Sequence, residues 1–403
     1  MRIAHVLRRL SFDDWGGTEQ VVWNLAKAQS KAGHEVRIFA TTALWKGVDG
    51  RPEDNAPGGG PELVISRFRP VYPWWPMPAR LVDELDRKGG NPFVPGMGRA
   101  IRDWRPDVIH CHAMARIAEL CLRTAAKCGA RSVISLHGGG ANVPEAEARS
   151  LKAPTRGLVP WGKALDIAMG WTRRIPEDFD GIVCVGEDEA DIWRRRHPRV
   201  LFLPNGVDTR IFGEAASRRA SRQASGRAPT ALCVARIDRQ KNQMALVEAL
   251  ARNPDLSVRL VGPVTQPDYL AEMSARAAAL GVSERLAVVG PLPPGSRELV
   301  SEYAAADLFV LPSRHEPFGI AALEAWAAGL PVAASDIGGL GRLCASHPGA
   351  AVTFRPDDPA GLDAAIRAAV RGAGELSANG RRAAAEYDWQ RISARAVEFY
   401  ALI

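Results

Sequence analysis

The stretch PSRHEPFGIAALEAWAAGLPVAAS, residues 312–335, decides the fold of this chain. The apolar run before it, residues 306–311, predicts a buried strand, and residues 320–328 predict a helix that a glycine and a proline end. Glu316 is therefore expected in a strand-to-helix loop, where the free N–H groups of a helix start can bind an anion or a hydroxyl-rich ligand. Glu324 follows about two helical turns later on the same side. The two carboxylates can contact two parts of one long, polar ligand.

This segment resembles the E-x7-E motif of retaining glycosyltransferases with the GT-B fold, family 4 in particular. Besides the spacing of the two glutamates, the Phe-Gly pair at 318–319, Leu-Glu-Ala at 323–325 and Gly-x-Pro-Val at 329–332 match the family. The alternative is an ordinary amphipathic helix with an exposed glutamate at each end of a turn. Further family-like segments in the expected order favour the resemblance.

Composition is that of an ordinary globular protein with two or three domains. The chain has 403 residues, of which 46% are hydrophobic and 24% charged. The sequence contains no run of eighteen apolar residues, so no membrane-spanning helix is expected. Residues 1–7 predict a first strand instead of a signal peptide. Six scattered cysteines without a CxxC pair predict reduced thiols in a cytoplasmic protein and no metal site.

Short apolar runs alternate with helical patterns along the whole chain, which predicts α/β layers with parallel sheets. In the first half we expect strands at residues 2–7, 35–40, 63–67, 108–111, 131–136, 181–185 and 200–203. In the second half we expect them at residues 230–234, 257–261, 286–289, 308–311, 331–334 and 351–354. The fold class implied by the resemblance is GT-B, with two Rossmann-like domains facing across a cleft.

The Pro-Asn-Gly-Val-Asp turn at residues 204–208 resembles the junction between the two family domains, although Asn-Gly is also a turn signal by itself. The resemblance implies an acceptor-side domain at 1–205 and a donor-binding domain at 206–385. A last helix at about 386–403 would pack back on the first domain. Residues 217–229, which are polar and rich in arginine, predict a link or loop.

The first strand is followed by Gly16-Gly17-Thr18-Glu19 and a helix expected over residues 21–32. Glycines before a helix let the backbone approach a ligand, and the helix N-terminus favours a phosphate. The resemblance assigns Gly16 and Gly17 to donor binding. Asp13-Asp14-Trp15 replaces the usual proline and glycine of the family, and the two aspartates are expected in solvent and not on a metal.

Three histidines follow predicted strands. His137 ends the run 131–136, at the strand end where open α/β sheets bind ligands. The resemblance places His137 close to the donor sugar, as a catalytic residue, against a purely structural role. His110 and His112 resemble a His-x-His element of the family, with a structural role favoured over a functional one.

Arg236 and Lys241, five positions apart after the strand at 230–234, suit a diphosphate, since an Arg fork and a Lys point charge converge there. We expect them to straddle the start of a helix that continues to residue 250. They resemble the Gly-Arg-x4-Lys pattern of the family, with Ala235 in place of the glycine. Arg239 is expected to face solvent. With these cations, no divalent metal is expected, which fits the metal independence common in GT-B enzymes.

By position, Pro291 and Leu292 resemble the loop against which the family packs the nucleobase. The resemblance implies that Glu316, with the backbone of Phe318, Gly319 and Ile320, holds sugar hydroxyls, and that Glu324 holds the ribose hydroxyls. Arg342 stands where the family has a glutamate, and the pattern offers no reason for it.

The net charge of +7 suggests an anionic partner. The arginines at 194–196 and 218–227 can contact an anionic membrane surface. Alternatively, they are only solvated side chains of a helix end and a loop. The absence of interleaved aromatics argues against nucleic acid. Residues 71–78, rich in aromatics and proline and too irregular for a strand, predict either an acceptor-binding or membrane-touching flap or a packed surface loop. Residues 44–60 predict a loop.

The resemblance implies a retaining glycosyltransferase that moves a sugar from a UDP- or GDP-sugar to an acceptor hydroxyl in bacterial glycan or glycolipid synthesis. The acceptor would be a sugar, a lipid-linked or a small molecule, and the protein cytoplasmic or peripheral at the inner membrane face. The family's usual mechanism loosens the bond to phosphate first; the acceptor then attacks from the same face, and the leaving phosphate takes its proton. An epimerase or disaccharide synthase on the same fold, and a non-catalytic nucleotide-sugar-binding subunit, remain alternatives.

Overall fold

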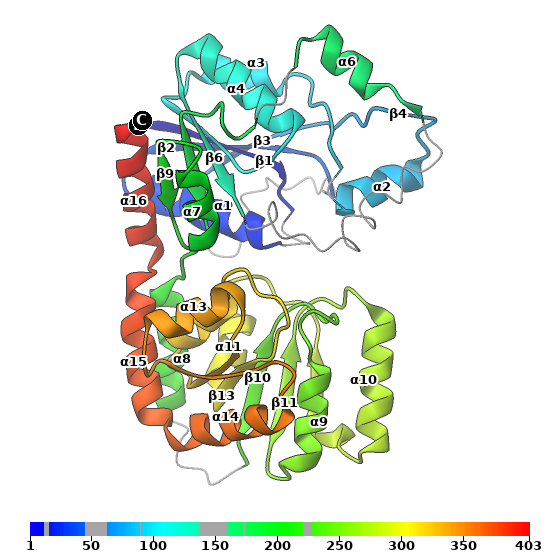
Figure 1. Ribbon diagram of the computed structural model, residues 1–403, viewed down its shortest axis with the longest axis vertical. Helices are drawn as coiled ribbons and strands as arrows, with labels where there is room; N and C mark the ends of the chain where they lie inside the picture. Colours follow the sequence, from blue (N-terminus) through cyan, green and yellow to red (C-terminus); the bar gives the residue numbers. More distant parts are fainter. Residues whose placement is uncertain (12–15, 45–62, 89, 138–158, 172–174, 221–227) are drawn as a thin grey trace. The chain divides into compact units, whose positions relative to one another are not determined.

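Two parallel β-sheets organise the chain, each within its own unit (Figure 1). In this computed structural model, residues 1–11, 16–44, 63–88, 90–137, 159–171, 175–220 and 228–403 are described. Unit 1 consists of Met1–Pro204 with Ile392–Ile403, and unit 2 of Asn205–Arg391.

Unit 1 holds a seven-stranded sheet in the order β3-β2-β1-β5-β6-β8-β9, and all its neighbouring strands run parallel. Its strands are β1 (Arg2–Arg9), β2 (Glu35–Thr41), β3 (Val64–Phe68), β5 (Val108–Cys111), β6 (Arg131–Leu136), β8 (Gly181–Cys184) and β9 (Val200–Phe202). Its helices are α1 (Gly17–Lys31), α2 (Ala79–Lys88), α3 (Met97–Trp104), α4 (Arg116–Cys128), α6 (Gly162–Ala168) and α7 (Glu187–Arg194), with most of α16 (Trp389–Leu402).

Unit 2 holds a six-stranded parallel sheet in the order β12-β11-β10-β13-β14-β15. Its strands are β10 (Thr230–Val234), β11 (Ser257–Val261), β12 (Leu286–Val289), β13 (Leu308–Leu311), β14 (Val332–Ser335) and β15 (Ala351–Phe354). Its helices are α8 (Thr209–Ala220), α9 (Met244–Arg252), α10 (Pro267–Ala279), η3 (Ser283–Arg285), α11 (Arg297–Ala305), α12 (Ile320–Ala327), α13 (Gly338–Ser346), α14 (Pro359–Arg371) and α15 (Ala373–Glu386).

The strand order has the same physical consequence in both units. In each sheet the chain first builds outward in one direction and then crosses to the other side, so the order reverses between β1 and β5 in unit 1 and between β10 and β13 in unit 2. Open α/β sheets bind ligands outside the carboxyl ends of the strands at such a reversal. The loops after these four strands are therefore the places to search for a site.

Apolar side chains of strands and helices form a separate core in each unit. The last helix is anchored to unit 1 at a close approach, where a Cβ on Gly181 at the start of β8 would lie 2.8 Å from the ring of Phe399. A larger residue than glycine at the start of β8 would therefore push α16 away from the sheet. Nε2 of Gln29 on α1 also donates to the hydroxyl of Tyr400 on α16, at 3.3 Å.

All thirteen predicted strands are present, with ends that differ by two residues at most. Some expectations were wrong in detail. The stretch 71–78 contains a short strand, β4 (Trp74–Trp75), which pairs antiparallel with β7 (Val159–Pro160) and so gains backbone partners that irregular aromatic and proline sequence did not suggest. Helix α1 begins at Gly17 instead of residue 21, because the carbonyl of Gly16 already accepts from the N–H of Gln20.

Residues 217–220, expected in a link, continue helix α8, while 221–227 lie outside the described residues. The expectations for Asp13, Asp14 and for residues 45–60 also fall outside the described ranges. Among the described residues, no helix is both long and apolar enough to cross a membrane. All six cysteines are free, and all but Cys128 are buried.

Candidate active site

The sheet reversal of unit 2 brings the two predicted charged motifs together. Arg236 and Lys241 follow β10, and Glu316 follows β13. Nζ of Lys241 lies 2.8 Å from Oε2 of Glu316, and their side chains are only 13% and 14% exposed. Two charges with so little contact with water would be costly unless paired, so the ion pair holds the two loops in one position.

The expectation that Arg236 and Lys241 straddle a helix start was wrong, since α9 begins only at Met244. The segment before it is a series of turns that Asp238 organises, because its carbonyl and its Oδ1 both accept from the N–H of Lys241, each at 3.1 Å. Asn242 adopts a left-handed φ of 54°, which a continuous helix does not tolerate. Both cations therefore lie on a loop that precedes the helix.

Arg236 and Arg239 have different surroundings. The guanidinium of Arg236 is half-exposed and lies 3.3 Å from a carboxylate oxygen of Asp238. Arg239 is also half-exposed, but it forms ion pairs with Glu272 and Asp268 of α10 and lies over the ring of Tyr269, 5.2 Å from its centroid. Arg239 is therefore held by acidic and aromatic groups of α10, away from the Lys241–Glu316 pair.

Glycines shape the loop that carries Glu316. Gly319, immediately before α12, has a φ of +99°, a left-handed conformation that few other residues adopt. A Cβ on Gly339, at the start of α13, would lie 1.9 Å from the carbonyl oxygen of Pro317, and its N–H donates to the carbonyl of Glu316 at 3.1 Å. The Gly-Gly pair at 338–339 thus supports the Glu316 loop directly, backbone against backbone. Phe318 in this loop is buried, with its ring centroid 6.0 Å from that of Tyr387.

Glu324 lies on α12 at only 5% exposure, and its Oε2 accepts from the hydroxyl of Tyr303 at 2.7 Å. Burial, followed by the charge of Glu324, raises the pKa of Tyr303 well above its usual value, so the phenol keeps its proton and donates.

Ile320 is the first residue of α12 and is half-buried. Pro291 is exposed in the loop after β12, and Leu292 packs against the core of unit 2. Arg342 is exposed on α13.

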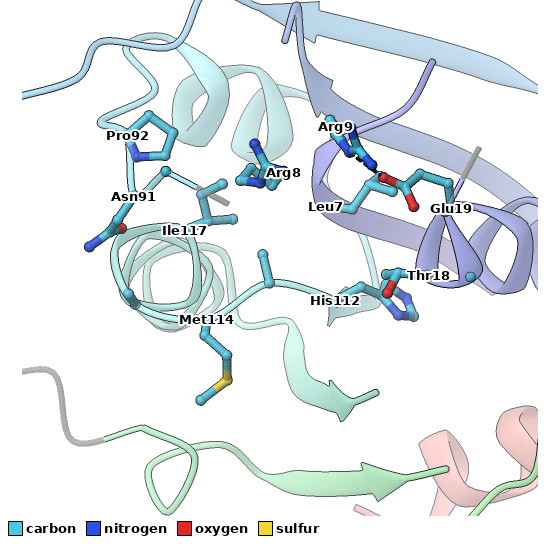
Figure 2. Close-up of a pocket in the computed structure, with 15 residues that line it drawn as sticks. Leu7, Arg8, Arg9, Thr18, Glu19, Asn91, Pro92, His112, Met114 and Ile117 are labelled. Carbon is cyan, nitrogen blue, oxygen red and sulfur yellow. Dashed lines mark hydrogen bonds and ion pairs between the residues drawn. The ribbon is translucent and has the colours of Figure 1, made fainter. Parts of the chain in front are cut away.

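Unit 1 has a cavity of about 440 Å³ at its own sheet reversal (Figure 2). It is lined by the last residues of β1, by the start of α1 with Gly16 and Gly17, and by residues after β5 with His112. Arg9 and Glu19 form an ion pair of 2.7 Å in its wall, the contact drawn in Figure 2. Arg8 lines the same cavity and donates to the backbone carbonyl of Asp86 at 2.7 Å.

The charge of Arg8 is not matched by a carboxylate in an ion pair among the described residues. Of the charged residues that line the cavity, Arg9 and Glu19 neutralise each other, which leaves the guanidinium of Arg8. Burial is the main reason why the pKa of Arg8 is below its usual value. Two helix N-termini, those of α1 and α4, also border the cavity through Gly17 and Ile117, and both favour negative charge. The cavity is therefore suited to an anionic group.

His137 follows β6 and contacts His112, which in turn contacts His5 of β1, a residue that sequence reasoning did not single out. His5, His110 and His112 have ring nitrogens within 4.8 Å of one another, a distance compatible with a metal ion. Their ring nitrogens, however, already lie 2.6–3.1 Å from other protein groups. Histidines at buried positions of the strands at 2–7 and 108–111 were the available sequence signal for this cluster.

Two models of glycosyltransferase families match the chain. Residues 15–211 match the model of Glycosyltransferase Family 4, and residues 216–387 match that of Glycosyl transferases group 1. The chain belongs to these glycosyltransferases.

The D-inositol 3-phosphate glycosyltransferase of Geodermatophilus obscurus is 36% identical to this glycosyltransferase over 236 residues, which are 54% of this chain and 51% of that protein. The glycogen synthase of Mycobacterium tuberculosis is 28% identical over 96% of this chain and 91% of its own length. The chain thus spans about half of the first relative and most of the second.

Solved structures agree with the GT-B fold. Sucrose-phosphate synthase from Thermosynechococcus elongatus superposes with a TM-score of 0.70 at 22% identity, covering 100% of this chain and 98% of that one. HepE of Anabaena, solved in complex with UDP and glucose, superposes with a TM-score of 0.70 at 16% identity over 100% and 99% of the two chains. At such identities the likeness establishes the fold.

Proposed function

We propose that this glycosyltransferase is a retaining, metal-independent hexosyltransferase that uses a UDP- or GDP-sugar. The observation that carries the proposal is the Lys241–Glu316 ion pair of 2.8 Å at the sheet reversal of unit 2, because it joins the two motifs that match the family. Arg236 and Lys241 bind the diphosphate and stabilise the charge that develops on it as the sugar leaves. Glu316 and the backbone at Phe318 and Gly319 bind sugar hydroxyls. That HepE was solved with UDP and glucose supports this class of donor.

Glu324 binds the ribose hydroxyls in this proposal. The hydroxyl of Tyr303 donates to this carboxylate and orients it. Pro291 and Leu292 contact the nucleobase, and His137 contacts the donor sugar. As the acceptor hydroxyl attacks, its proton passes to the leaving phosphate, so the protein contributes position and charge. Production of glycan or glycolipid at the inner membrane face remains part of the proposal.

The experiment that tests the donor is a thermal-shift screen of the full chain against UDP-, GDP- and ADP-sugars. A donor at 100 times its dissociation constant stabilises the folded protein by about 2.7 kcal/mol. Two results support the proposal: one nucleotide sugar stabilises the protein, and the sugar is transferred with retained anomeric configuration, as measured by NMR of the product. Inverted configuration excludes the retaining mechanism, and a new epimer formed without acceptor identifies an epimerase.

The acceptor carries an anionic group, a phosphate or a carboxylate, that Arg8 binds in the cavity of unit 1. The unmatched guanidinium and the two helix N-termini favour this, and a phosphorylated acceptor would agree with the name of the inositol phosphate relative. Arg8→Gln should raise the KM of a phosphorylated acceptor at least tenfold and leave the donor KM unchanged, whereas Arg99→Gln, at an exposed position of α3, serves as the control. Equal KM values for the acceptor with and without its phosphate would contradict this assignment.

A further inference from the structure

A continuous series of hydrogen bonds runs through the interior of unit 1, starting at His137. Nε2 of His137 lies 3.1 Å from Nδ1 of His112, and Nε2 of His112 lies 2.9 Å from Nδ1 of His5. Nε2 of His5 lies 2.7 Å from Oε1 of Gln29 on α1. His5, Gln29 and His112 are buried.

From Gln29 the series continues to the C-terminal helix and back to the sheet. Nε2 of Gln29 donates to the hydroxyl of Tyr400 at 3.3 Å, and this hydroxyl lies 2.6 Å from Nδ1 of His110. Nε2 of His110 lies 2.7 Å from Oγ of Ser135 on β6. We call the seven side chains of these two segments the histidine chain.

With the amide of Gln29 oriented so that Oε1 lies toward His5 and Nε2 toward Tyr400, all hydrogen bonds of the histidine chain run in one direction. A neutral imidazole has one N–H donor and one acceptor nitrogen, so each ring passes the direction on to the next. The amide oxygen of Gln29 faces His5, which makes Nε2 of His5 the donor and Nδ1 the acceptor. The same rule then gives His112 and His137 an Nε2–H.

The other segment obeys the same direction. The amide nitrogen of Gln29 donates to Tyr400, so the Tyr400 hydroxyl donates to Nδ1 of His110 and leaves the Nε2–H of His110 for Ser135. Burial lowers the pKa of His5 and of His137 to about 4, and it lowers the pKa of His110 and His112 well below the usual value. All four rings are therefore neutral at pH 7.

We propose that the histidine chain is a positioning device that holds His137 as its Nε2–H tautomer, so that its Nδ1 can accept a hydrogen bond from a substrate hydroxyl. That Nδ1 makes no hydrogen bond with the residues that the structure describes. The bare Nδ1 of such a ring can accept from an O–H group, but it has no proton to donate to a phosphate oxygen. The contact with substrate rests on the proposed function, whereas the tautomer does not.

A zinc ion is the competing occupant of this cluster. Ligation by His5, His110 and His112 would require each ring to give up a hydrogen bond that the structure shows. Because the hydrogen bonds account for both nitrogens of all three rings, we favour the histidine chain over a metal site.

The test is the tautomeric state of each ring in the full chain, labelled with ¹⁵N-histidine and measured at pH 7 by long-range ¹H–¹⁵N correlation. Single His→Gln variants assign the signals. We expect a protonated Nε2 and a bare Nδ1 for His5, His110, His112 and His137. An Nδ1–H form or an imidazolium at any of the four rings overturns the proposal, and so does loss of the signals of the buried three on addition of one equivalent of Zn²⁺.

A variant tests whether the histidine chain sets the tautomer of His137. Gln29→Met removes the acceptor of His5 while nearly keeping the side-chain volume, so the ¹⁵N shifts of His137 should move toward those of a mixture of tautomers. Gln20→Met, on the same helix but outside the histidine chain, should leave them unchanged. Unchanged shifts of His137 in folded Gln29→Met overturn the proposal.

The activity of the same variant separates this inference from the proposed function. Gln29→Met should lower kcat/KM for the donor about tenfold, and Gln20→Met should not. One outcome separates the two claims: the wild type has the expected tautomers and the His137 signals shift in Gln29→Met, but this variant keeps full activity. The histidine chain would then still set the tautomer of His137, and the contact between His137 and substrate would be overturned. Donor binding is scored separately by the thermal-shift screen, so a failed screen does not change the NMR result.

Discussion

Lys241 and Glu316 show why single residues of this site could be recognised in the sequence. Each follows a buried strand of the unit 2 sheet, and parallel strands end at the same edge, so residues far apart in sequence meet. The contact itself required the structure. His5 and Tyr400 were missed because their partners lie 107 and 290 residues away, on elements whose pairing no local pattern reveals.

At this scale the first prediction concerns the phosphate-binding cations. Arg236→Ala and Lys241→Ala should each lower kcat by roughly a hundred- to a thousand-fold, or about 2.7–4 kcal/mol, because the charge on the diphosphate grows in the transition state. The donor KM should change less than kcat. Steady-state kinetics with the donor found in the screen checks this, and Arg236→Lys should recover only part of the rate, since it lacks the planar fork.

Arg239→Ala is the matched control for both variants. Its guanidinium is bound to Glu272 and Asp268 of α10, so its loss should leave kcat nearly unchanged. A crippled Arg239→Ala beside a mild Arg236→Ala would show that the phosphate is bound elsewhere.

A second residue-scale prediction follows from Glu324. Glu324→Ala should weaken binding of the free nucleoside diphosphate by about 1.5–3 kcal/mol, because charge-assisted hydrogen bonds to two hydroxyls are lost. Isothermal titration calorimetry measures it. Tyr303→Phe, which removes the hydroxyl that donates to Glu324, should have the smaller effect. Equal affinity of Glu324→Ala and wild type would refute the ribose contact.

The third prediction is an acid sensitivity caused by the buried histidines. The folded pKa of His5 is about 4, below the usual 6.5, so the unfolded chain binds more protons between these values and stability falls as pH falls from 6.5 to 4. His5 alone accounts for about 3 kcal/mol of this loss. Urea unfolding at a series of pH values should show a shallower acid limb for His5→Gln than for wild type.

His315→Gln provides the comparison, because His315 is exposed. Its acid limb should coincide with that of wild type. The same limb in His5→Gln and in wild type would mean that His5 is not buried in neutral form.

At the scale of elements, the strands and the start of α12 were predictable from the sequence, whereas the starts of α1 and α9 were not. A buried parallel strand is a short apolar run that can be read directly, as for β10 and β13. Helix starts depend on which side chains compete for the first backbone groups, and the carboxylate of Asp238 and the left-handed Asn242 delay α9 to Met244. The pairing of β4 with β7 joins segments some 85 residues apart and leaves no local signal.

The element-scale prediction concerns the start of α13. Gly339→Ala places a methyl group where the Pro317 carbonyl lies, so the loop that holds Glu316 must move. Such overpacking typically lowers folding stability by about 1–3 kcal/mol. Expressed as free energies, the loss in kcat/KM should exceed the loss in folding stability, because the loop carries the site. Melting temperature and kcat/KM, measured on the same preparation, compare the two effects.

Gly374→Ala is its control, since a Cβ at this position of α15 would meet nothing within 4 Å. It should be active and at least as stable as wild type, since alanine is favoured over glycine in a helix. Full activity of Gly339→Ala would show that the loop position does not matter for the chemistry.

At the scale of the whole molecule, the same strand order occurs twice, and each copy supplies one set of groups at its own reversal. Unit 2 supplies cations paired with carboxylates, and unit 1 supplies a cavity lined by Arg8, which forms no ion pair with the residues that the structure describes. The boundary between the two units lies between Pro204 and Asn205, within the Pro-Asn-Gly-Val-Asp turn at residues 204–208. The sugar, the base and the acceptor depend on side chains that the motifs do not include, which is why they need the donor screen.

The last prediction is that turnover survives complete chelation. Arg236 and Lys241 are two cations at the reversal of the unit 2 sheet, able to neutralise a leaving diphosphate without a divalent ion. Among the described residues, the one group of three potential metal ligands is His5, His110 and His112, whose nitrogens are engaged with other side chains. Initial rates after dialysis against EDTA should match those with added Mg²⁺ or Mn²⁺. A rate that disappears with EDTA and returns with either metal would assign to an ion the charge stabilisation that we assign to Arg236 and Lys241.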